Sequence, residues 1–139
     1  MNRFTQIPLI LFLILIASCS KTKNDICDAS QICYTQKPDE LYVKIALTNT
    51  PTSEPVEVKL YIGNLDDGEL YDNYYSANNN EYHLMPVDER YTATAKYVKD
   101  GDTIIVIDSD KLAAISYKNC DETCYDYDDE IILNLQLEK

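Results

Sequence analysis

Four of the five cysteines in this 139-residue chain stand in two close pairs, and the chemistry of cysteine depends strongly on spacing. Cys27 and Cys33 have C-x5-C spacing, and Cys120 and Cys124 have C-x3-C spacing. Such pairs hold zinc or form disulfides, but zinc sites usually have about two to four residues between the ligands of each pair. The wider first spacing therefore favours disulfides, with zinc as the alternative.

An acidic run, residues 121–130, begins inside the second cysteine pair and extends beyond it. Carboxylates are preferred ligands of Ca²⁺, which tolerates irregular loops, but this run does not have the spacing of an EF-hand. The two interpretations left open are a solvated acidic loop and a calcium site. The candidate calcium ligands are Asp121, Glu122, Asp126, Asp128, Asp129 and Glu130. No other cofactor is expected.

His83 is the only histidine of the chain. The alternation of residues 81–86 places it on the face opposite Leu84, and we expect a surface residue rather than a catalyst. The sequence contains no nucleophile elbow, no H-E-x-x-H motif, no P-loop and no dinucleotide fingerprint. Among 24 acidic residues, a pair at hydrolytic distance arises by chance. We therefore expect no enzymatic activity, and a small hydrolase is the enzymatic alternative.

Tyrosine dominates the aromatic residues, with 12 Tyr, 2 Phe and no Trp. Both phenylalanines, Phe4 and Phe12, lie in the first 18 residues, so the rest of the chain builds its core from aliphatic side chains and tyrosine rings. Four tyrosines flank an asparagine triplet at 78–80: Tyr71, Tyr74, Tyr75 and Tyr82. They are expected either to cover the core or to form an exposed patch for a glycan or protein partner.

The elements that position these residues follow a hydrophobic leader. Residues 8–17 carry no polar side chain, and a run of this length is too short to cross a bilayer as a helix, which takes about 20 residues. One arginine precedes the run and small residues end it, as in a secretory signal. Residues 1–18 are therefore expected to be a signal peptide.

The tetrapeptide Ile16-Ala17-Ser18-Cys19 resembles the lipobox of bacterial lipoproteins. The resemblance implies lipidation of Cys19 and attachment to a membrane, and Ser20 in place of an acid implies delivery to the outer membrane, on its periplasmic side or at the cell surface. Lipid on Cys19 would leave an even number of cysteines in an oxidising compartment. Three pairings are possible, and we expect bridges that link the 27/33 pair to the 120/124 pair rather than two local loops.

Residues 19–39 are polar and aperiodic and are expected to form a tether, followed by one domain at 40–139. Apolar residues alternate with polar ones beyond the tether, which indicates half-buried strands. Asp67-Gly68 and Asp100-Gly101 are expected to supply the positive φ angles of tight hairpins. We predict an antiparallel β-sandwich of about seven strands. The expected strands are 41–48, 55–63, 69–76, 81–86, 90–99, 102–109 and 130–138, with a weaker candidate at 112–118.

The stretch LMPVDERYTATA, residues 84–95, resembles the turn and strand that contain the tyrosine corner of fibronectin type III and immunoglobulin-like domains. The resemblance implies that Tyr91 hydrogen-bonds back to the preceding loop. Ala93 stands where immunoglobulin domains carry a cysteine, so any bridge must come from the terminal pairs. Residues 76–97 also resemble transthyretin-like modules found beside carboxypeptidases.

The formal charge of −12 disfavours nucleic acid and favours cationic partners. These features together predict a membrane-anchored envelope lipoprotein whose sandwich is a binding or structural module, with an unidentified protein or glycan partner. A lipoprotein inhibitor of a secreted hydrolase and a small envelope hydrolase remain as alternatives.

Overall fold

The computed structural model describes residue 27 and residues 30–49 and 54–137. The signal peptide, Cys19 and the start of the tether lie outside these residues. The described part is all β, as predicted. Its nine strands are β1 (Glu40–Ala46), β2 (Val56–Ile62), β3 (Glu69–Ser76), β4 (Asn80–Pro86), β5 (Arg90–Lys99), β6 (Asp102–Lys111), β7 (Ser116–Asn119), β8 (Glu122–Tyr125) and β9 (Glu130–Asn134).

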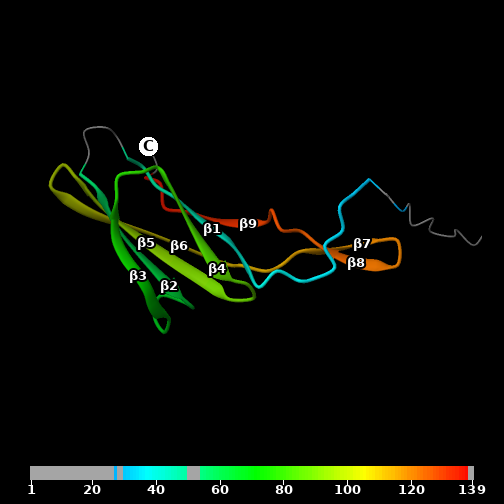
Figure 1. Ribbon diagram of the computed structural model, residues 1–139. Coiled ribbons are helices and arrows are strands. Elements are labelled where there is room, and N and C mark those ends of the chain that lie inside the picture. The colour runs from blue at the N-terminus through cyan, green and yellow to red at the C-terminus, as the bar shows by residue number, and fades with distance from the viewer. Residues whose placement is uncertain (1–26, 28–29, 50–53, 138–139) are drawn as a thin grey trace, which may run out of the picture.

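Seven of these strands form the two layers of a β-sandwich (Figure 1). One sheet has the order β3-β2-β5-β6 and is antiparallel throughout. The other has the order β4-β1-β9, and β9 runs parallel to β1 rather than antiparallel. The predicted sandwich is therefore confirmed, but its smaller sheet is mixed. A long connection leads from the edge strand β6 to β9. After this connection β9 runs in the same direction as β1.

The core lies between the layers and is built from the inward half of each alternation. Leu41, Val43 and Ile45 of β1 face Val58 and Leu60 of β2, and all five side chains are buried. Two tyrosines, Tyr91 and Tyr97, belong to the buried core, and the half-buried Tyr74 packs against it. Tyr91 is fully buried, and Tyr97 donates a hydrogen bond from Oη to the carbonyl of Leu135 at 2.7 Å. The hydroxyls of these core tyrosines therefore have partners, as buried phenols require.

Tyr91 has the geometry of a tyrosine corner. Its Oη donates to the carbonyl oxygen of Pro86 at 2.6 Å, across the loop that joins β4 to β5. Burial of the hydroxyl is the main reason that the pKa of Tyr91 is raised to about 12, and the charge of Glu89 adds to it. The bond fixes the loop that crosses from one sheet to the other.

The two predicted Asp-Gly turns differ in the structure. Asp100 and Gly101 both have positive φ, 55° and 88°, and form the expected two-residue turn between β5 and β6. The expectation for Asp67-Gly68 is wrong, because the positive φ of the β2–β3 connection is at Gly63, 99°. A glycine is required at position 68 for another reason, which is that there is no room for a side chain. A Cβ at this position would lie 2.3 Å from the carbonyl oxygen of Asn64, whose contact with the Gly68 amide closes the turn.

A further hairpin, β7–β8, projects from the sandwich as an arm (Figure 1). Only its first half overlaps the weak strand candidate at 112–118, and β8 was not predicted. Disulfides join Cys27 to Cys120 and Cys33 to Cys124, so the bridges run between the two pairs. Each of these four cysteines is in a disulfide, so none of them has a free thiol to bind zinc, and the zinc alternative is ruled out.

The bridges also change the predicted tether. Tyr34 forms an isolated antiparallel bridge with Tyr125, Tyr117 Oη donates to the Ile32 carbonyl at 2.9 Å, and Tyr127 Oη donates to the Gln36 carbonyl at 3.0 Å. The described part of the tether therefore lies along the arm as a fixed segment that leads into β1.

Candidate functional site

A polar seam closes the side of the sandwich where β3 and β4 meet. The register places Tyr74 of β3 on the same face as core residue Val58, and His83 of β4 on the same face as core residue Val43. Tyr74 Oη and His83 Nε2 are 2.9 Å apart. Ser76 Oγ donates to Glu81 Oε1, and Asn78 Nδ2 donates to the same oxygen at 3.0 Å. The seam thus joins the edges of the two sheets.

The electrostatics of the seam hold Tyr74 in its protonated form. Burial of the hydroxyl raises the pKa of Tyr74 well above that of a free tyrosine, and the carboxylates of Glu81 and Asp72 raise it further. A protonated phenol can donate a hydrogen bond to His83 Nε2 or accept one from it, according to the tautomer of the imidazole ring. This arrangement ties Tyr74 and His83 to each other rather than offering either group to a substrate.

The predicted surface position of His83 holds only in part, because the side chain is half-buried. His83 does lie on the face opposite Leu84, but His83 points toward the interior, whereas Leu84 is 50% exposed. The reason is the pairing of β4 with β1, because residues directly opposite one another share a face. Met85 pairs with Leu41 and is fully buried, which fixes Leu84 on the outside.

The four tyrosines of the predicted patch do not gather on one surface. Tyr74 lies in the seam, and Tyr75 is on the outer face of the four-stranded sheet with 71% of its surface exposed. Tyr71 is exposed at the irregularity where β3 leaves register with β2. Tyr82 lies on the outer face of the other sheet, away from the other three.

Tyr82 instead belongs to an apolar surface that the sequence analysis did not identify. The register of β4-β1-β9 puts Leu84 opposite Tyr42, Tyr82 opposite Lys44, and Ile132 beside Lys44. The rings of Tyr42 and Tyr82 meet edge to face with centroids 6.4 Å apart, and Lys44 Nζ lies 5.7 Å from the centre of the Tyr82 ring. We call this surface the outer patch: Tyr42, Tyr82, Leu84 and Ile132, each between 50% and 55% exposed.

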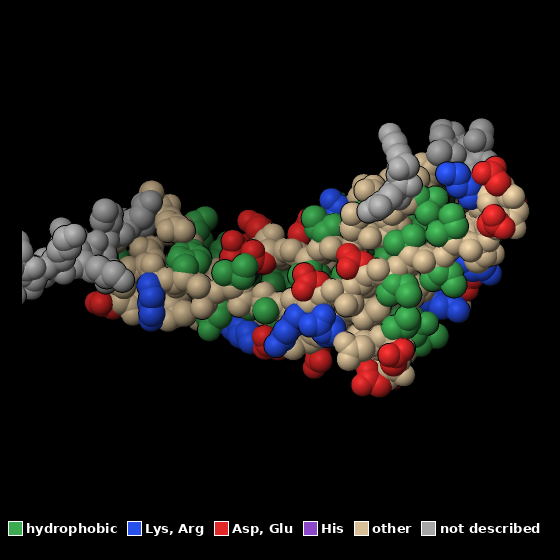
Figure 2. All heavy atoms as spheres, turned by 180° about the vertical axis from the view of Figure 1, so that it is seen from behind, with side chains coloured by type: hydrophobic (Ala, Val, Ile, Leu, Met, Phe, Trp, Pro, Cys, Tyr) green, Lys and Arg blue, Asp and Glu red, His purple; other side chains and the backbone are tan. Residues whose placement is uncertain are grey.

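One signal for the outer patch was present in the sequence. The alternation of residues 41–47 already placed Tyr42 opposite the aliphatic side chains of its strand. The partners of Tyr42 could not be found in this way, because they come from β4 and β9, which are distant in the sequence. On the face shown in Figure 2, hydrophobic side chains form several separate groups among acidic and polar ones, over both the sandwich and the arm.

The candidate calcium ligands are dispersed along the arm. Asp121 and Glu122 lie at the tip of the β7–β8 hairpin, whereas Asp126, Asp128 and Asp129 follow the other end of β8. Among the residues that the structure describes, no three His, Cys, Asp or Glu side chains form a group able to hold a metal ion. Asp129 carries a buried Oδ2 without a hydrogen-bond partner. Burial, followed by the charge of Asp126, raises the pKa of the Asp129 carboxyl.

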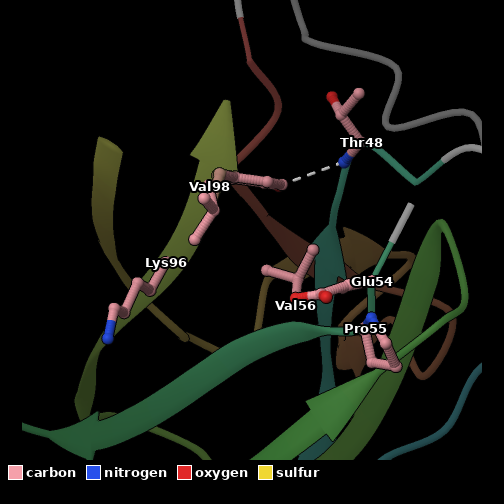
Figure 3. A pocket seen from close by; sticks show the side chains of 7 residues that line it. Thr48, Glu54, Pro55, Val56, Lys96 and Val98 are labelled. Carbon is pink, nitrogen blue, oxygen red and sulfur yellow. Dashed lines mark hydrogen bonds between the residues drawn. The ribbon is translucent and has the colours of Figure 1, made fainter. Parts of the chain in front are cut away.

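A pocket of about 320 Å³ opens at one end of the sandwich (Figure 3). Thr48, Glu54, Pro55 and Val56 line one side, and residues of β5 line the other: Lys96, Tyr97 and Val98. The amide of Thr48 donates to Tyr97 Oη at 3.1 Å. Lys96 points away from Glu54 in Figure 3, and its Nζ lies 3.8 Å from Glu57 Oε2. Among the described residues that line this pocket, Glu54 is the one carboxylate, so these residues do not provide the carboxylate pair of a glycosidase.

Within residue 27, residues 30–49 and residues 54–137, no helix is long and apolar enough to cross a membrane. Comparison with known proteins finds no match for this chain, whether against protein families, curated proteins or solved structures.

Proposed function

We propose that this chain is a bacterial envelope lipoprotein, anchored in the outer membrane through lipid on Cys19, whose sandwich binds a protein partner. The observation that carries the binding role is the outer patch. Four large side chains from three strands share one sheet face, and each remains about half exposed. Scattered apolar residues are ordinary on protein surfaces, but a contiguous group of this kind is typical of an interaction site.

The composition of the outer patch favours a protein over a glycan. Tyrosine is enriched in protein interfaces, and such interfaces have an apolar centre with a polar rim. Exposed Glu40 and Glu130 lie on the same face as Tyr42 and supply such a rim. A sugar ring stacks best on aromatic rings that share a plane, whereas the planes of Tyr42 and Tyr82 are 89° apart. The acidic rim fits a partner with basic residues around an apolar centre.

The anchoring role rests on the lipobox and is supported by the disulfides. Structural disulfides form in oxidising compartments such as the periplasm. The bridge at Cys27 also shortens the free tether, because eight residues after Cys19 span at most about 29 Å when fully extended. The arm would therefore remain near the membrane, while the sandwich and its outer patch lie beyond it.

Replacement of Cys19 tests the anchor. Cys19→Ser is expected to abolish labelling by a fatty-acid analogue and to leave the chain unprocessed or released from membranes. Ser20→Ala is the matched control and should be labelled like the parent. Labelling of Cys19→Ser at the parental level would end the lipoprotein proposal.

Site-specific photo-crosslinking tests the outer patch. A photoreactive phenylalanine at position 82 is expected to form one discrete cross-linked protein species in the envelope. The same residue at position 75 is the matched control, because Tyr75 is also exposed but lies on the opposite sheet. A Tyr42→Ser/Leu84→Ser variant should lose the species formed from position 82 while keeping its melting temperature. Equal cross-linking from positions 75 and 82 would refute the outer patch as the binding surface.

A further inference from the structure

Strand β6 forms one edge of the four-stranded sheet, and among the described strands its one partner is β5. It is ten residues long and stays in register with β5 along its whole length. Natural edge strands are usually protected by charges, prolines, bulges or short length. The centre of β6, residues 104–107, reads Ile-Ile-Val-Ile and contains neither a charge nor a proline. An edge of this kind can form backbone hydrogen bonds with an additional strand.

The turn between β5 and β6 shows which backbone groups face the open edge. A two-residue turn at Asp100-Gly101 makes Lys99 and Asp102 a hydrogen-bonded pair. Because bonded and non-bonded pairs alternate along an antiparallel ladder, Ile104 and Val106 also bond to β5. The N–H and C=O groups of Ile105 and Ile107 therefore point away from the sheet. Their side chains are 60% and 52% exposed.

A groove runs beside this edge. It has a volume of about 540 Å³ and lies between β6 and the segment that continues β9, and its lining residues are Ile104, Val106, Ile107, Asp108, Asn134, Gln136 and Leu137. The amide of Asn134 donates to Asp108 Oδ2 at 2.7 Å, and this contact closes one end of the groove. The groove thus offers a free backbone edge on one side and a mixture of aliphatic and polar side chains beside it.

We propose that β6 accepts an extended segment of a partner protein as an added strand, and that this segment has a short aliphatic centre flanked by lysine or arginine. Main-chain bonds to Ile105 and Ile107 supply the pairing, and alternate side chains supply the specificity. The flanking charges follow from the ends of β6. Asp102 lies before the aliphatic centre, and Asp108 and Asp110 lie after it, where they outnumber the single lysine that ends the strand, Lys111.

The same charges disfavour a second copy of this chain as the occupant. A symmetric antiparallel pairing of two β6 strands about Val106 would place Asp102 opposite Asp110 of the other copy. Like charges directly opposite one another destabilise a sheet. Two chains with a formal charge of −12 each also repel one another at longer range.

A designed peptide tests the proposal on the full chain in detergent. The probe is an end-blocked, fluorescent peptide with four alternating valine and isoleucine residues between two pairs of lysines. It is expected to bind by fluorescence anisotropy and to slow hydrogen exchange at the amides of Ile105 and Ile107. The same peptide with glutamate in place of lysine should bind more weakly, because it meets the aspartates of β6.

Proline substitution distinguishes strand addition from non-specific binding of the peptide. Ile107→Pro removes an outward N–H without removing a bond to β5, so the sheet should persist. It is expected to weaken peptide binding by about two- to tenfold, the worth of one hydrogen bond, while Ile107→Val, which keeps the N–H, binds like the parent. Ile105→Pro is the second variant if Ile107→Pro fails to fold.

Three outcomes would overturn the proposal: binding of the proline variant at the parental affinity, exchange protection mapped away from β6, or self-association of the chain that Ile107→Pro abolishes. This inference requires neither lipidation of Cys19 nor the outer patch. Loss of cross-linking at position 82 therefore leaves it intact.

Discussion

Removal of the Tyr91 hydroxyl is the sharpest test of how this sandwich is held together. Tyr91→Phe keeps the ring in the core and deletes only the hydrogen bond from Oη to the Pro86 carbonyl, which is 2.6 Å long. Because the ring is fully buried, phenylalanine should occupy the same site without a cavity. The measured change then reports the hydrogen bond and little else.

We expect Tyr91→Phe to lower the free energy of unfolding by about 1 kcal/mol, within the range of about 0.5–1.5 kcal/mol for a neutral hydrogen bond. The upper part of the range requires an acceptor that stays buried and unpaired. Pro86 is an exposed residue and its hydrogen bond with Tyr91 is only partly buried, so we expect a loss below the upper end of the range.

Urea melts of the parent and three variants make the comparison. Tyr42→Phe and Tyr61→Phe are the controls, since Tyr42 is 50% exposed and Tyr61 is half-buried at the sheet surface. Only Tyr91→Phe should lower the midpoint clearly, with an unchanged m-value. If Tyr91→Phe unfolds at the urea midpoint of the parent, or if Tyr42→Phe loses as much stability as Tyr91→Phe, the hydrogen bond does not fix the β4–β5 loop.

The same variant should change the response to alkaline pH. The pKa of Tyr91 is raised from 10.0 to about 12 in the folded state, so the folded chain holds a proton that the unfolded chain releases. The corresponding stability is complete below pH 10 and is lost as the pH rises toward 12. Tyr91→Phe should therefore lose less stability over this interval than the parent. Tyr74 and Tyr97, whose pKa values are raised in the same direction, should leave a residual slope.

Three further predictions concern the bridges, Asp129 and Gly68. Replacing either cystine alone by serines should cost about 3 kcal/mol, because the remaining bridge still closes the long loop, whereas loss of both should cost about 7–8 kcal/mol in the chain-entropy model. Denaturant melts that show a double loss no larger than the sum of the single losses would contradict this. Asp129→Asn should raise the melting temperature at neutral pH, because burial raises the pKa of Asp129 and its ionised form is therefore destabilising. The difference in melting temperature between variant and parent should vanish near pH 3, where the acid is protonated. Equal gains at both pH values would show that ionisation is not the cause. Gly68→Ala should destabilise the protein more than Gly101→Ala. A Cβ at position 68 would lie 2.3 Å from a backbone atom, whereas at position 101 the cost is only the strain of a positive φ. The reverse order of stabilities in thermal melts would argue against the close approach to Asn64.

The sequence by itself determined the seven strands of the sandwich and several of their connections. Strict alternation at 41–47, 56–62 and 131–137 located β1, β2 and β9, because a half-buried strand has a period of two. Asp100-Gly101 fixed the β5–β6 turn, since its conformation needs positive φ at both positions. Tyr91 could be assigned because the tyrosine corner is a local structure spanning only residues 86–91.

Only the tertiary structure decided which faces are buried and which strands meet. Alternation divides a strand into two faces but does not say which face meets the core when both carry apolar groups. In β4, Tyr82 and Leu84 compete with His83 and Met85, and the pairing with β1 turned the first two residues outward. The parallel β9, the groove beside β6 and the outer patch all join residues that are distant in the chain. Such surfaces follow from sheet order, which is set by packing of the whole core rather than by any local pattern.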